Sequence, residues 1–248
     1  MISYILLFLF GIIAGTLNVI AGGGSFLTMP LLIFLGLPPT VANGTNRVGI
    51  LLQNVGAVWG FHRHKVVDWR YVVWAALPAT AGALLGAWGA VRIGEQAFKN
   101  VLALIMIMVT LWTLWDPLKG ADSGGPVAEK PRVWLLAAGF FLVGIYGGFV
   151  QAGVGFLVLA ATTLAGLDLV RGNAVKVLSI LIYTLLALGV FIWQDKVHWP
   201  LGLTLAAGTV VGGQLGVHLT VLKGHTWVKK VVTTAVIVLA IKLLVMKM

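Results

Sequence analysis

The sequence is a succession of long apolar runs separated by short polar gaps. The runs cover residues 3–21, 26–37, 40–61, 71–91, 98–115, 133–151, 155–167, 172–193, 201–222 and 228–246. A helix needs about 20 apolar residues to cross the hydrocarbon core of a bilayer. Most of the runs have about this length, but 26–37 and 155–167 are too short to span comfortably, and their length leaves open whether they cross. We therefore expect an all-α polytopic membrane protein with about eight crossings.

Charged residues are scarce, and most of them stand in the gaps or near the C-terminus. They make up 10% of the chain, whereas soluble proteins carry roughly 25%. All seven acidic residues lie in gaps, and only Arg47 and Lys176 fall well inside candidate helices. The net charge of +10 comes from scattered loop clusters, which favour the positive-inside rule over nucleic-acid binding.

The chemistry of the side chains argues against an enzyme. The chain has no cysteine, and its five histidines show no metal-ligand spacing. Because no carboxylate lies in a predicted span, a carboxylate proton relay or sodium cage is not expected. His218, in the run 201–222, is the one spare proton carrier. The sequence predicts no catalytic residue, no metal and no cofactor.

The two halves of the chain resemble each other at an ungapped offset of 130 residues. The polar segment 116–132 separates a first transmembrane repeat, 1–115, from a second, 133–248, each of a four-helix type. Paired positions include Phe26 with Phe156, Asn43 with Asn173, Phe61 with Phe191 and Trp69 with Trp199.

Each half contains a glycine-rich break before its short apolar run, at Gly22-Gly23-Gly24 and at Gly153-Val154-Gly155. Such breaks interrupt helices and are typical of transporters. If each broken region crosses the membrane once, the repeats are parallel; if it folds as a hairpin, they are inverted. The distribution of Lys and Arg over the two sides favours inversion.

The glycine breaks are candidates for an anion site. Two half-helices that meet at mid-membrane present free N–H groups and a positive dipole end. The alternative is close helix packing, which we favour for Gly11, Gly15, Gly82 and Gly86. The backbone donors expected at the site belong to Gly22, Gly23, Gly24, Ser25, Gln151, Gly153 and Gly155.

Polar residues form one stripe on each of two helices. Successive residues of a helix are rotated by about 100°, so the polar residues of the helix 40–61 fall within an arc of about 120°. They are Asn43, Asn46, Arg47, Gln53 and Asn54. The counterpart helix carries Asn173, Lys176, Ser179, Tyr183 and Thr184. An intramembrane cation indicates function, so Arg47 and Lys176 are the leading anion ligands; the alternative is that both snorkel to the interface.

The motif Gly22-Gly23-Gly24-Ser25-Phe26, with Pro30-Leu31-Leu32 and Ala42-Asn43-Gly44-Thr45 after it, resembles the sulfite exporter TauE/SafE family. In the second half, Gly144-Ile145-Tyr146-Gly147-Gly148-Phe149 and Gly153-Val154-Gly155-Phe156 resemble the family's second signature. The resemblance implies a carrier in the cytoplasmic (inner) membrane that exports sulfite or an organosulfonate such as sulfoacetate. Gln151, Ala160 and the segment 171–176 depart from the family pattern.

The expected partners are a small anionic substrate and the lipid bilayer, with a possible homo-dimer. The proposed mechanism is alternating access around a midplane anion site. An uptake carrier for another small anion is one alternative, and a membrane assembly factor without transport is another.

Overall fold

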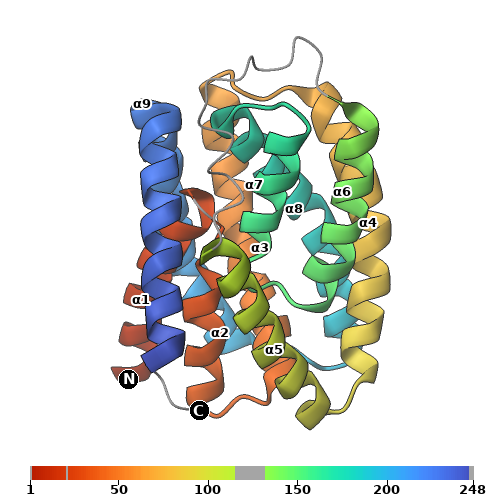
Figure 1. The fold of residues 1–248 in the computed structure, drawn as a ribbon. Coiled ribbons are helices and arrows are strands. Elements are labelled where there is room, and N and C mark those ends of the chain that lie inside the picture. The colour runs from red at the N-terminus through yellow and green to blue at the C-terminus, as the bar shows by residue number, and fades with distance from the viewer. Residues whose placement is uncertain (1, 21, 115–131, 246–248) are drawn as a thin grey trace.

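The computed structural model describes residues 2–20, 22–114 and 132–245, and within these ranges every regular element is an α-helix (Figure 1). Almost all of the predicted linker 116–132 lies outside the described residues. The helices are α1 (Ile2–Ile20), α2 (Ser25–Phe34), α3 (Pro39–Arg63), α4 (Trp69–Arg92), α5 (Glu95–Leu114), α6 (Val133–Phe149), α7 (Val154–Leu164), α8 (Leu169–Trp193) and α9 (Trp199–Val245).

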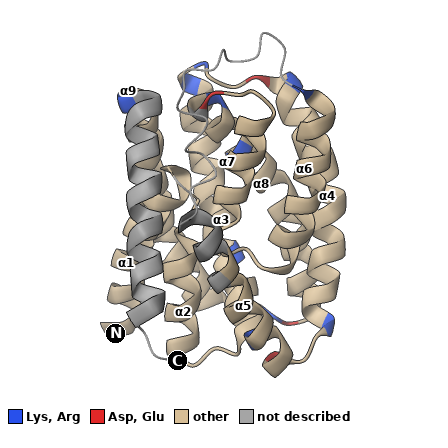
Figure 2. Cartoon of the chain, viewed as in Figure 1, with Lys and Arg blue, Asp and Glu red and all other residues tan. Residues whose placement is uncertain are grey.

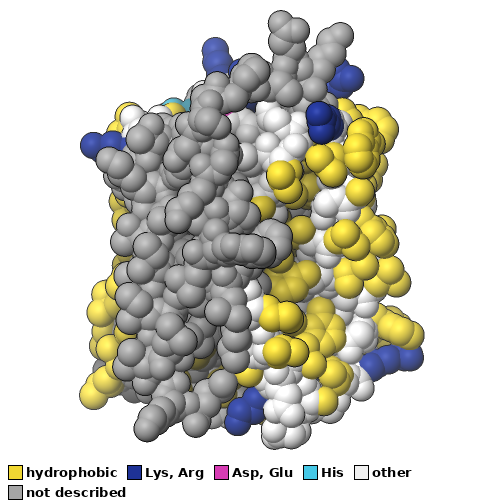
Figure 3. Space-filling view, in the orientation of Figure 1, with side chains coloured by type: hydrophobic (Ala, Val, Ile, Leu, Met, Phe, Trp, Pro, Cys, Tyr) yellow, Lys and Arg dark blue, Asp and Glu magenta, His cyan; other side chains and the backbone are white. Residues whose placement is uncertain are grey.

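The surface has the character of a membrane protein. Charged residues gather at the two ends of the helix bundle, and few lie in its body (Figure 2). In Figure 3 the described part of the side wall carries hydrophobic side chains, while Lys and Arg lie at its upper and lower rims. Most of the exposed tryptophans among the described residues stand near helix ends, where an aromatic belt forms at the lipid headgroups: Trp59, Trp69, Trp88, Trp134, Trp193 and Trp199.

Four described helices are long and apolar enough to cross a membrane: Ile2–Ile20, Trp69–Arg92, Val170–Trp193 and Trp199–Lys223. Helix α3 has 25 residues, as many as α8, but its polar stripe lowers its hydropathy. The short runs 26–37 and 155–167 form the short helices α2 and α7, which have 10 and 11 residues, or roughly 15 Å of helix each. The total of about eight crossings stays a prediction.

Helices of the second half begin and end about 130 residues after those of the first. Helix α8 occupies the bounds of α3 moved by 130, and α9 begins 130 residues after α4. Gly36 and Gly166 both have a positive φ, and so do Lys65 and Asp195. The loop after α3 lies at the upper edge of Figure 1, and the loop after α8 lies at the lower edge. Inverted halves would have this arrangement, and the inverted repeat itself stays a prediction.

Small residues bring two pairs of helices into close contact. A β-carbon on Gly82 or Gly86 of α4 would lie 2.2 or 2.0 Å from a carbonyl oxygen of α6. One on Gly15 of α1 would lie 2.5 Å from the carbonyl oxygen of Thr209 in α9. Gly11 faces α9 in the same way. The close-packing interpretation of these four glycines is confirmed.

Glu95 fastens the first turn of α3 from another helix. Pro38, the residue before α3, provides no side-chain cap. The Glu95 carboxylate accepts instead from the backbone N–H of Thr40 at 2.9 Å, and it also accepts from the Thr40 hydroxyl. Lys196, between α8 and α9, lies 2.9 Å from the same carboxylate. Burial alone would raise the pKa of Glu95, but the Thr40 and Lys196 contacts outweigh burial and hold it below its ordinary value of 4.5.

Candidate functional site

The two glycine breaks meet in the interior of the protein. A β-carbon on Gly22 would lie 2.1 Å from the Cα of Gly155, and one on Gly155 would lie 2.2 Å from the Cα of Gly22. Gly22 also has a φ of +87°, which only glycine adopts without strain. The rings of Phe26 and Phe156 stack beside this contact, with centroids 6.4 Å apart. The starts of α2 and α7 therefore lie together.

Lys176 of α8 holds the end of α1, the helix that precedes the first break. Its side chain is 1% exposed, and its Nζ donates to the carbonyl oxygens of Val19 at 2.7 Å and Asn18 at 3.2 Å. These oxygens belong to the last turn of α1, where the helix dipole is negative. Because Lys176 is buried, the snorkelling interpretation is wrong for it.

Arg47 of α3 holds the end of α6, the helix that precedes the second break. It is fully buried, and its Nη2 donates to the carbonyl oxygens of Gly148 at 2.5 Å and Gly147 at 3.0 Å. Its guanidinium carbon lies 4.6 Å from the centroid of the Phe191 ring. The snorkelling interpretation is wrong for Arg47 as well. Each half of the chain thus supplies a cation that binds the carbonyl end of a helix in the other half.

Asn43 and Asn173, which occupy matching positions in the two halves, repeat this exchange with uncharged groups. Asn43 donates from Nδ2 to the carbonyl oxygen of Phe149 at 2.8 Å, at the end of α6. Asn173 donates to the carbonyl oxygen of Ile20 at 3.3 Å, at the end of α1. The orphan carbonyls of both broken helices are therefore satisfied by side chains from α3 and α8.

Gln151, between α6 and α7, connects several polar residues. Its Oε1 accepts from Nη1 of Arg47 at 2.7 Å. Its Nε2 donates to the hydroxyl oxygens of Tyr183 at 3.4 Å and Thr184 at 3.2 Å, and its backbone N–H donates to Oδ1 of Asn43 at 3.4 Å. The predicted residues Arg47, Asn43, Tyr183 and Gln151 thus form one network.

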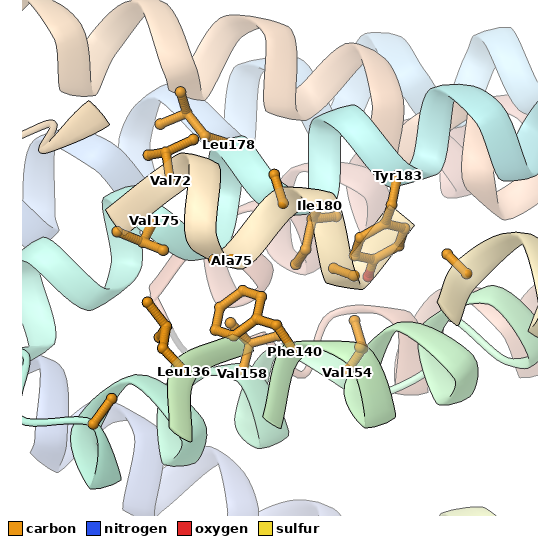
Figure 4. Packing of buried hydrophobic residues seen from close by; sticks show 14 of the residues in the cluster. Val72, Ala75, Leu136, Phe140, Val154, Val158, Val175, Leu178, Ile180 and Tyr183 are labelled. Atoms are coloured by element: carbon orange, nitrogen blue, oxygen red, sulfur yellow. The ribbon is translucent and has the colours of Figure 1, made fainter. Parts of the chain in front are cut away.

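A small cavity adjoins this network. It measures about 10 Å³, close to the room that one water molecule needs. Its wall is formed by Asn18, Ile50, Asn54, Gln151, Val154, Lys176 and Ile180. Three of the predicted site residues, Lys176, Asn54 and Gln151, therefore meet at the cavity, whereas Arg47 is absent from its wall. Figure 4 shows Val154, Ile180 and Tyr183 within the apolar cluster that packs α4, α6, α7 and α8 together.

The cavity wall has hydrogen-bond donors to spare. Asn54 is buried, and its Nδ2 has no partner among the described residues. Val154 is the first residue of α7, whose N-cap Gly153 provides no side-chain hydrogen bond. A helix start without such a cap leaves backbone N–H groups free for an anion. An ammonium, an amide and the start of a helix are therefore available at the cavity.

The remaining predicted residues fasten helices to one another. Asn46 accepts from the Thr28 hydroxyl at 2.6 Å and donates to the Ser25 hydroxyl at 3.2 Å, which ties α2 to α3. Gln53 accepts from Nδ2 of Asn18 at 3.3 Å. Gly23 and Gly24 are buried in the first break. A β-carbon on Gly24 would lie 2.0 Å from the carbonyl oxygen of Ala14. These residues shape the site without lining the cavity.

The electrostatic balance of the interior is positive. Each helix end carries about half an elementary charge, positive at the start and negative at the end. The ends of α1 and α6 lie at Lys176 and Arg47 and offset about half of each formal charge, while the starts of α2 and α7 add positive charge. All seven acidic residues lie in polar gaps, so no carboxylate within the apolar runs neutralises these cations. An anion would.

Asn18 is the site residue that the sequence interpretation missed. It lies on the cavity wall and binds two predicted site residues, Gln53 through its side chain and Lys176 through its carbonyl oxygen. A single amide in the apolar run 3–21 could have indicated it, because intramembrane polar residues are functional candidates. His218 is exposed and does not line the cavity. Among the described residues, no group of His, Cys, Asp or Glu could hold a metal ion.

Comparison with known proteins shows that the chain is similar to membrane transporters. The model of the family described as "Sulfite exporter TauE/SafE" matches residues 7–243. A probable membrane transporter protein of Haemophilus influenzae is 28% identical over 92% of this chain and 89% of its own length. The probable membrane transporter protein ORF9 of Sinorhizobium sp is 32% identical over 96% of this chain and 91% of its own length. The probable membrane transporter protein YfcA of Escherichia coli K12 is 29% identical over 96% of this chain and 88% of its own length. No solved structure gives a significant match.

Proposed function

Because this chain belongs to the sulfite exporter TauE/SafE family, and is accordingly a multi-pass membrane transporter, we propose that it exports a small sulfur oxyanion across the cytoplasmic membrane. The substrate class is sulfite or an organosulfonate such as sulfoacetate. The observation that carries the proposal is the buried cation Lys176 at a cavity wall that also holds a free amide and a helix start. A sulfur oxyanion presents three or more acceptor oxygens to such donors.

Three residues of the cavity wall would bind the anion in different ways. The Lys176 ammonium provides the positive charge. The amide nitrogen Nδ2 of Asn54, which has no partner within the described ranges, donates a hydrogen bond to the anion. The start of α7 at Val154 lies on the cavity wall and directs the positive end of the helix dipole toward the anion. Arg47 does not reach the cavity; it holds the end of α6 and the side chain of Gln151.

Transport requires the helices to move. The cavity of about 10 Å³ admits one water molecule, which is too little for a sulfur oxyanion. The two glycine breaks touch through bare backbone at Gly22 and Gly155, so a relative shift of the two halves would open this contact first. Alternating access by rocking of one half against the other fits a site that is enclosed between them.

The membrane potential favours the export of an anion over its uptake. An anion that leaves a cell with an inside-negative potential gains about 2.3 kcal/mol per charge per 100 mV. Because the apolar runs contain no acidic residue, no carboxylate is placed there to carry a coupling ion. Outward movement of an anion down this potential needs no coupling ion.

The test is counterflow of labelled sulfite and sulfoacetate in proteoliposomes. Loss of one charged hydrogen-bond donor at the site costs about 1.5–3 kcal/mol, so Lys176→Met should weaken apparent affinity about 10- to 150-fold. Lys99→Met, at an exposed lysine of α5, is the matched control and should leave flux unchanged. Saturable wild-type flux that Lys176→Met alone impairs supports the proposal. Absence of wild-type flux for every sulfur oxyanion would refute it.

A further inference from the structure

Gln151 stands between one of the two interior cations and the cavity. It is 1% exposed, it lines the cavity, and its Oε1 accepts from Nη1 of Arg47 at 2.7 Å. Arg47 itself is not part of the cavity wall. The Gln151 side chain therefore separates the guanidinium from any anion in the cavity.

Several hydrogen bonds fix the position of the Gln151 side chain. Besides the contact with Arg47, its Nε2 donates to the hydroxyls of Tyr183 and Thr184, and its backbone N–H donates to Asn43. A side chain with these contacts does not rotate away without breaking buried hydrogen bonds. Gln151 is a fixed part of the wall.

The two halves differ at this position. The residue 130 positions before Gln151 is Ala21, which has no side chain beyond its β-carbon. Lys176, the cation that holds the end of α1, lies on the cavity wall itself. One cation is therefore open to the cavity, and the other is covered by an amide.

From this asymmetry we infer that Gln151 sets the size and charge of the transported anion, so that the site accepts a compact sulfur oxyanion and rejects a longer sulfonate that carries a second anionic group. The inference rests on the proposed function and narrows its substrate class. The bulk of Gln151 limits the length of the anion. The same side chain, which contacts Arg47, covers the second cation by its volume and keeps it from pairing with a carboxylate at the far end of the substrate.

Removal of the side chain should reverse this selectivity. Gln151→Ala joins the space of the side chain to the cavity and exposes the guanidinium of Arg47. Gln151→Met is the matched control, because methionine fills a similar volume and carries no amide. The measurement is inhibition of labelled sulfite counterflow in proteoliposomes by unlabelled sulfite and by sulfoacetate, a sulfonate with a carboxylate. The readout is the ratio of their half-inhibitory concentrations.

We expect Gln151→Ala to shift this ratio toward sulfoacetate by about tenfold or more, as one new charged contact predicts. Gln151→Met should keep the wild-type preference for sulfite. If Gln151→Ala is not recovered as a monodisperse protein, Gln151→Asn, shorter by one methylene, should shift the ratio in the same direction. An unchanged ratio in a shortened variant that still transports sulfite, or an equal shift in Gln151→Met, overturns the inference. Absence of wild-type flux overturns the proposed function instead.

Discussion

The contact between the two glycine breaks can be tested with three alanine substitutions that separate backbone strain from steric overlap. At Gly22 an alanine meets both, because φ is +87° and its β-carbon would lie 2.1 Å from the Cα of Gly155. At Gly36 it meets strain alone, since φ is +94° and nothing lies within 4 Å. At Gly155 it meets overlap alone, with Gly22 at 2.2 Å and no positive φ.

The expected costs follow from these differences. A left-handed conformation costs a non-glycine residue about 1–2 kcal/mol, and overpacking of a tight interior costs about 1–3 kcal/mol. Gly36→Ala should therefore lose about 1–2 kcal/mol of stability, and Gly22→Ala about 2–5 kcal/mol. Gly155→Ala should lie between wild type and Gly22→Ala, because better helix propensity offsets up to about 1 kcal/mol of its overlap.

The assay is the loss of monodisperse protein after heating in detergent, at one heating time for all variants. The midpoint of Gly22→Ala should fall below those of Gly36→Ala and Gly155→Ala. Sulfite counterflow, normalised to folded protein, should fall in Gly22→Ala and Gly155→Ala and survive in Gly36→Ala. A Gly22→Ala protein as stable and active as Gly36→Ala would show that the breaks do not touch, and would refute the arrangement of the site.

Three further predictions follow from the polar contacts. Asn43→Leu and Asn173→Leu should each cost about 1–3 kcal/mol of stability, because each leaves the last carbonyl of a broken helix unpaired. Asn43→Leu should cost more, because Asn43 also accepts from the backbone N–H of Gln151; a thermal series in which either variant is as stable as wild type would contradict the helix-end role. Asn54→Ala should weaken apparent sulfite affinity about tenfold without loss of stability, because its Nδ2 has no partner within the described ranges to lose; a destabilised variant would contradict this. The pKa of Glu95 is lowered on folding, so its contribution to stability is full above pH 4.5 and is lost as pH falls through the lowered pKa. Wild type should accordingly lose more thermal stability than Glu95→Gln in that acidic range, and parallel losses would contradict a role for the pair with Lys196.

Much of the fold can be predicted from hydropathy and repeat spacing. The run 40–61 became α3, Pro39–Arg63, and its counterpart α8 is offset by 130 residues. The short runs became short helices because the glycine breaks uncouple them from α1 and α6. The polar stripes could be placed inside because lipid excludes five polar side chains on one face. Asn43, Asn46, Arg47, Gln53 and Asn54 are all buried.

The contacts of Arg47 could not be predicted in the same way. Its partners are two backbone carbonyls of α6 and the amide of Gln151. Backbone acceptors leave no mark on a sequence, because every residue has one. The stripe showed that Arg47 faces inward, but its distance from the cavity depends on how α3 packs against the second half. For this reason the two cations seemed equivalent, and the structure brings only Lys176 to the cavity wall.

The choice of partners for the two cations bears on function. An arginine or lysine inside a membrane protein pairs with an acidic residue or with backbone carbonyls. A carboxylate partner satisfies both its hydrogen bonds and its charge. Here helix-end carbonyls satisfy hydrogen bonds of Arg47 and Lys176, and the helix dipole offsets only about half of each charge. The carbonyls fix the positions of the cations while their field stays unbalanced. A mobile anion can therefore serve as the missing counterion, and it can leave again without stranding a permanent carboxylate.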